Sequence, residues 1–93
     1  MTLPARYGVT TARALARDPW CVFVYWEAEG AAEVRLGAAR AVASDAGSHY
    51  FAAEPGREYV AEVLDRGGRV LATSNRVRTP RVRAAVVEAT SRA

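Results

Sequence analysis

The chain contains no lysine, one cysteine and one histidine among its 93 residues. A lone cysteine, Cys21, excludes an internal disulfide, and one cysteine with one histidine falls short of the four ligands of a structural zinc site. No apolar run approaches the roughly 20 residues that a membrane-spanning helix needs, and residues 1–6 lack the hydrophobic core of a signal peptide. We therefore expect a cytoplasmic protein that uses no cofactor or metal and binds no membrane.

Acidic residues are missing from two stretches of the chain. The charged residues of residues 1–17 and 66–83 are all arginines, with net charges of +3 and +6. In residues 18–65, nine acids against three arginines give a net charge of −6. Two basic segments therefore flank an acidic one. The hydrophobic fraction of 51% predicts a folded protein, and the length predicts one small domain with a thin core.

The most apolar stretch of the chain, residues 20–27, predicts a β-strand because β-branched and aromatic residues dominate it. Alternation places Val22, Val24 and Trp26 on one face of this strand and Cys21, Phe23 and Tyr25 on the other. Both faces are apolar. The face with Phe23 and Tyr25 is therefore either covered by the C-terminal tail through Val82 and Val86 or is an exposed binding surface.

Shorter patterns predict further strands, separated by turns. These strands are expected near residues 11–17, 33–36, 40–43, 48–53, 58–65 and 70–73, and residues 77–79 are expected to extend the last of them. Residues 44–47 are expected in a loop, and Gly67-Gly68 predicts a tight hairpin. After Pro80, apolar residues at helical spacing predict a short C-terminal helix, with a frayed tail as the alternative.

About seven short strands without an earlier amphipathic helix predict an all-β, two-sheet sandwich of the immunoglobulin-like class. Pro55-Gly56 followed by Tyr59 is typical of a tyrosine corner, in which the phenol bonds back across the preceding connection. Together with Trp26 at the end of the early strand, this order resembles fibronectin type III domains. This resemblance implies that Val22, Val24 and Trp26 form the core face of the early strand. It implies that the residues across from them are Tyr59, Ala61, Val63, Val34, Leu36 and Val77. We expect an arm at residues 1–9, the sandwich at 10–80 and a tail or helix at 81–93.

A second resemblance covers roughly residues 3–81. It rests on Leu3-Pro4, Tyr7-Gly8, Asp18-Pro19-Trp20, Tyr25-Trp26-Glu27, Pro55-Gly56 with Tyr59, Ser74-Asn75 and Arg78-Thr79-Pro80-Arg81. In this order, the motifs resemble a bacterial domain family of unknown function marked by Asp-Pro followed by a Tyr-Trp-Glu strand. The resemblance implies a context beside α-glucan-processing enzymes or in chains with a nucleic-acid-binding segment. This chain departs from longer members in its short loops.

No catalytic motif accompanies the possible nucleophiles. His49 lies near Ser44 and Asp45 in sequence, but nothing supplies an oxyanion hole or a nucleophile elbow. Cys21 sits inside an apolar strand, which favours a packing role over a nucleophilic one. We therefore expect no enzyme.

Two surfaces remain as candidates for binding a partner. The first is the face with Phe23 and Tyr25, and the second is the arginine-rich end of the chain. The partner-binding candidates in this second region are Arg76, Arg78, Arg81 and Arg83. A structural interpretation of these arginines is an edge strand protected from aggregation by charge.

The sequence thus predicts a binding or assembly module whose partner is another protein or a second copy of the chain. One alternative is carbohydrate (α-glucan) binding on an aromatic platform of Trp20, Tyr7 and Tyr50. Another is nucleic-acid binding through the arginines, although residues 66–83 hold no aromatic residue for base stacking.

Overall fold

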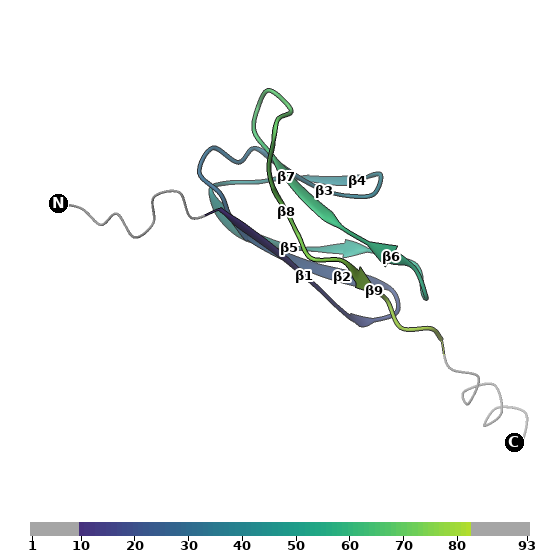
Figure 1. Ribbon diagram of the computed structural model, residues 1–93. Helices are drawn as coiled ribbons and strands as arrows, with labels where there is room; N and C mark the ends of the chain where they lie inside the picture. Colours follow the sequence, from purple (N-terminus) through teal and green to yellow (C-terminus); the bar gives the residue numbers. More distant parts are fainter. Residues whose placement is uncertain (1–9, 83–93) are drawn as a thin grey trace, which may run out of the picture.

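Nine antiparallel β-strands and no helix make up residues 10–82, the part of the chain that the computed structural model describes (Figure 1). The strands are β1 (Thr11–Asp18), β2 (Cys21–Glu27), β3 (Glu33–Leu36), β4 (Ala39–Val42), β5 (Ala46–Ala52), β6 (Glu58–Tyr59), β7 (Ala61–Leu64), β8 (Val70–Thr73) and β9 (Val77–Arg78). Within this part, no helix exists with the length and apolar character needed to cross a membrane. The predicted arm and most of the predicted tail lie outside the described residues.

The strands form three sheets, with the orders β1-β2-β5, β4-β3-β7-β8 and β6-β9. Figure 1 shows the first sheet running beneath the second, with β6 and β9 at one end. The hydrophobic core joins residues of both larger sheets, including Val22 and Val24 from β2 and Val34 and Val63 from β3 and β7. This arrangement is compatible with a β-sandwich.

The predicted core of β2 is confirmed. Val22 and Val24 are fully buried and Trp26 is 5% exposed. Among the predicted partners, Ala61, Val63, Val34 and Leu36 are buried, and Tyr59 and Val77 are half-buried against the same core. The indole Nε1 of Trp26 donates to the carbonyl of Ser44 at 2.8 Å, which satisfies the one polar atom of this side chain.

The strand expected at residues 11–17 is also confirmed as β1, which lies at the edge of its sheet. Its alternation buries Ala12 and Ala14 and leaves Arg13 and Leu15 exposed. Small side chains on the inner face suit a strand that lies close to the opposite sheet. On the side of β1 away from β2, the side chain of Asn75 donates to the carbonyl of Ala14 at 3.1 Å and accepts from its amide at 2.9 Å. An amide side chain therefore replaces a neighbouring strand at this edge.

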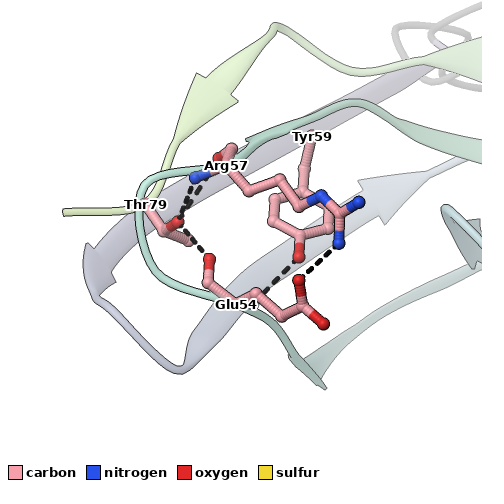
Figure 2. Close-up of polar contacts among 4 residues, drawn as sticks. All are labelled: Glu54, Arg57, Tyr59 and Thr79. Atoms are coloured by element: carbon pink, nitrogen blue, oxygen red, sulfur yellow. Dashed lines mark hydrogen bonds and ion pairs between the residues drawn. The ribbon is translucent and has the colours of Figure 1, made fainter. Parts of the chain in front are cut away.

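The predicted bond of the tyrosine corner is confirmed (Figure 2). The backbone amide of Glu54 donates to the phenolic oxygen of Tyr59 at 2.9 Å. The buried side chain of Thr79 binds the same turn from the other side, because its hydroxyl accepts from the amide of Arg57 at 3.0 Å and donates to the carbonyl of Glu54. Two distant side chains thus hold the turn at residues 54–57 in place.

Three strand predictions are wrong in detail. Ala46 and Gly47 belong to β5 and not to a loop, because Trp26 on β2 pairs with Gly47 and Glu27 with Ala46. The strand expected at 58–65 divides into β6 and β7 at residue 60. Residues 77–78 pair with β6 and do not extend β8. In each case, the pairing of strands distant in sequence decides where a strand begins and ends.

Candidate interaction surface

The outer face of the three-stranded sheet carries a row of apolar side chains across its strands. Leu15 on β1 pairs with Phe23 on β2, and Phe23 pairs with Tyr50 on β5. One step along the sheet, Arg13 pairs with Tyr25. Directly opposite residues of antiparallel strands project to the same face, so the three strands together bring these five side chains onto one surface.

This aromatic face, defined by Leu15, Phe23, Tyr25 and Tyr50, is open to solvent. Leu15 and Tyr25 are each 42% exposed and Tyr50 is 68% exposed. The ring of Phe23 lies between the two tyrosine rings, with centroid distances of 4.6 Å to Tyr50 and 5.8 Å to Tyr25. Large apolar side chains gathered on an exposed sheet face are characteristic of a binding surface.

A depression of about 340 Å³ lies at one end of the aromatic face. It is lined by Leu15, Arg17, Asp18, Cys21, Phe23 and Tyr50. A register shift between Leu15 and Asp18 displaces β1 against β2 at this point. Such a bulge redirects side chains. The depression therefore combines apolar walls with a charged rim.

The electrostatics of this surface come from arginines on β1. Within residues 10–82, neither Arg13 nor Arg17 forms an ion pair. Asp18 lies beside Arg17 at the depression, but its Oδ1 accepts from the amide of Trp20 at 2.7 Å. Two exposed guanidinium groups are thus available to a carboxylate of a ligand.

The arginines near the end of the chain are placed differently. Arg78 donates to Glu58 at 3.0 Å and to the carbonyl of Gly56, also at 3.0 Å. Arg76 lies 4.0 Å from the same carboxylate. The side chain of Arg81 packs over Gly56, and Arg83 lies outside the described residues. The structure therefore joins Arg76 and Arg78 to β6, and these pairs stabilise the β6–β9 contact only modestly because they are exposed.

Of the residues predicted to form a carbohydrate platform, Trp20 and Tyr50 lie in the described part of the chain. Trp20 is 58% exposed, but it makes no ring contact within residues 10–82 and does not line the depression. Tyr50 instead contacts Phe23 at an interplanar angle of 43°, and Tyr7 lies outside the described residues. The ring pairs of this face are tilted, with interplanar angles of 33° for Phe23 and Tyr25 and 43° for Phe23 and Tyr50.

Each residue considered for catalysis makes its own contact with a different residue of the fold. His49 packs edge-on against Phe51, with ring centroids 4.6 Å apart. The hydroxyl of Ser44 donates to the carbonyl of Ala46, and Oδ1 of Asp45 accepts from the amide of Gly30. The part of the chain that the structure describes also holds no group of three potential metal ligands.

Sequence reasoning identified Phe23 and Tyr25 but did not join Leu15, Arg17 and Tyr50 to them. Leu15 and Tyr50 each follow the alternation of their own strand, which is a visible signal for the face they share. The order of the strands in the sheet is decided by long-range pairing, which local patterns do not contain.

Comparisons with protein-family models, curated proteins and solved structures found no match to this chain. The resemblance to the Asp-Pro and Tyr-Trp-Glu family therefore stays a prediction.

Proposed function

We propose that this chain is a non-enzymatic binding module that docks a protein partner on the aromatic face. The observation that carries the proposal is the cross-strand row of Leu15, Phe23 and Tyr50, exposed on the outside of a sheet whose other face supplies the core. Burial of apolar surface is worth about 25 cal/mol per Å², so leaving such a row exposed is a disadvantage unless a ligand covers it.

The proposed partner segment has an apolar anchor and an acidic residue beside it. The depression accepts a side chain between Leu15, Phe23 and Tyr50, where tyrosine and phenylalanine rings supply rigid contact area. Arg17 at its rim provides a bidentate partner for a carboxylate. The arginines on and beside β9 are less suited to this role because Arg76 and Arg78 already pair with Glu58.

The proposed architecture behind this module is a fibronectin type III-like sandwich. Support comes from the strand orders β1-β2-β5 and β4-β3-β7-β8, from the phenol of Tyr59 bonded to the amide of Glu54, and from buried Trp26 at the end of β2. In such a scaffold the aromatic face belongs to the sheet of the first, second and fifth strands.

The test is selection from a random peptide library on the immobilised protein, followed by titration of the selected peptides. We expect sequences with an aromatic or aliphatic residue flanked by aspartate or glutamate. Phe23→Ala with Tyr50→Ala should weaken binding by about tenfold or more, as loss of interface anchors does. Val42→Ala is the matched control because Val42 is 92% exposed on β4, in the other sheet.

Charge reversal distinguishes binding at the proposed site from a general attraction of acidic peptides to the arginines of the chain. Arg17→Glu should abolish binding of acidic peptides and favour basic ones, whereas Arg76→Glu should leave the selected peptides bound. Selection of the same peptides by wild type and by Phe23→Ala/Tyr50→Ala would show that the aromatic face is not the site. Loss of binding only in Arg76→Ala/Arg78→Ala would move the site to the β6–β9 end.

A further inference from the structure

The edges of the two larger sheets differ in how they are protected from pairing with another strand. At β1, the side chain of Asn75 occupies both backbone groups of Ala14. Strands β4 and β8 are only four residues long, and β4 carries Arg40. Strand β5 is seven residues long and contains no proline and no formally charged residue at pH 7, and among residues 10–82 it pairs only with β2. Short length and charge are the usual protections of an edge, and β5 has neither.

The backbone groups on the free side of β5 can be assigned from its contacts with β2. The amide of Ala53 donates to Trp20 and the carbonyl of Asp45 accepts from Ala28, so the odd-numbered residues face β2. Because backbone groups alternate along an antiparallel strand, the even-numbered residues direct theirs away from the sheet. These residues are Ala46, Ser48, Tyr50 and Ala52, and all four are exposed. Within the described residues, the hydroxyl of Ser44 donates to the carbonyl of Ala46, which keeps a second lone pair.

We propose that two copies of this chain pair through their β5 edges, antiparallel and about a two-fold axis. One register places all four outward-facing residues opposite one another: Ala46 faces Ala52 of the second copy, and Ser48 faces Tyr50 of the second copy. In this register the two-fold axis passes between His49 of one copy and His49 of the other. This register forms the largest number of backbone hydrogen bonds that the edge allows, because each such pair exchanges two of them.

The side chains of β5 favour a second copy over an unrelated strand. On the outer face, the small side chain of Ser48 stands opposite the large ring of Tyr50 from the other copy, and the reverse holds across the axis. A strand that meets its own copy brings like charges together wherever it is charged. Strand β5 avoids this repulsion at neutral pH because it carries no aspartate, glutamate or arginine.

The resulting dimer would have one six-stranded sheet in the order β1-β2-β5-β5-β2-β1. The aromatic faces of both copies then form one surface, with the two Tyr50 side chains near its middle. The depression beside Leu15 and Arg17 lies toward the β1–β2 side of each copy, so edge pairing leaves it open. Self-pairing and partner docking share Tyr50 but otherwise use different parts of the molecule, so a variant that keeps β5 intact separates them.

The experiment is sedimentation equilibrium of the full chain from about 1 to about 200 μM, a range suited to the micromolar affinity of a small interface. We expect a monomer–dimer equilibrium for the wild type and for the control Val42→Lys. Two double variants, Ser48→Lys/Tyr50→Lys and Ser48→Glu/Tyr50→Glu, place like charges opposite one another at both outer pairs. Each should raise the dimer Kd by about tenfold or more.

Mixing the two double variants tests the register itself. Lysine then stands opposite glutamate at both pairs, so the mixture should form heterodimers at concentrations where each variant alone is monomeric. Heterodimer formation also shows that both variants are folded. As an independent measurement on the wild type, amide exchange at Ser48 and Tyr50 should slow as the protein concentration rises.

Three results would overturn the proposal. These are a wild type that stays monomeric up to the highest concentration, a dimer that persists in both charged variants, and a mixture that forms no heterodimer although each variant shows the circular dichroism of the wild type. Phe23→Ala/Tyr25→Ala should keep the dimer and lose the selected peptides. A dimer lost in that variant would be a fourth contrary result and would place self-association on the aromatic face instead.

Discussion

Replacing Thr79 by valine tests how the turn at residues 54–57 is held. The hydroxyl of Thr79 accepts from the amide of Arg57 and donates to the carbonyl of Glu54, and the side chain is 1% exposed. Valine keeps the shape of threonine and replaces the hydroxyl with a methyl group, which cannot form hydrogen bonds. Thr79→Val therefore leaves two backbone groups without their partner while the packing around the methyl group is preserved (Figure 2).

The magnitude follows from where these two groups lie. A buried polar group that loses its partner costs about 1–3 kcal/mol. Glu54 and Arg57 belong to an exposed turn, so water reaches them and the lower end of the range applies to each. We expect Thr79→Val to reduce the free energy of unfolding by about 2 kcal/mol, a large part of the roughly 5–15 kcal/mol of a small domain.

The assay is urea unfolding followed by intrinsic tryptophan fluorescence, since Trp26 is buried and should respond to loss of the core. Thr79→Ser is the matched control because it keeps the hydroxyl and loses one methyl group, which costs about 1 kcal/mol. Tyr59→Phe removes the second support of the same turn, with an expected loss of about 1 kcal/mol. If Thr79→Val lost less than Thr79→Ser, methyl packing and not hydrogen bonding would hold this turn.

Further substitutions test other contacts of the fold. In Gly47→Ala, the new Cβ would lie 3.0 Å from Cζ2 of Trp26. We therefore expect thermal unfolding to show a loss of about 1–3 kcal/mol in the free energy of unfolding, and a variant as stable as the wild type would contradict this close packing. Asn75→Ala removes both bonds to Ala14 and should speed amide exchange in β1 more than in β2; equal effects on the two strands would refute the edge-covering role. Val24→Ala should lower the free energy of unfolding by about 2 kcal/mol in the same urea assay because Val24 is fully buried. A loss under about 0.5 kcal/mol would show that the core relaxes around the smaller side chain.

Local patterns in the sequence determined most strands of this protein and which side chains share a face. Alternation in residues 20–27 was sufficient to predict that Val22, Val24 and Trp26 lie together, because side chains of a strand point to opposite faces at each step. The prediction that this face is the buried one came from the resemblance to fibronectin type III domains, because the other face is apolar too. The turn at Pro55-Gly56 and the position of Tyr59 were likewise sufficient to predict the phenol–amide bond. These features depend on residues close together in the chain.

The tertiary structure decided which strands are neighbours, and that decides the surfaces. Leu15, Phe23 and Tyr50 come from three strands, and only the order β1-β2-β5 aligns them in one row. The same order makes β5 an edge, while a side chain 61 residues away from Ala14 covers the edge at β1. Pairing between distant segments arises from hydrogen bonding and packing of the whole fold, so a local pattern predicts a strand but not its neighbour.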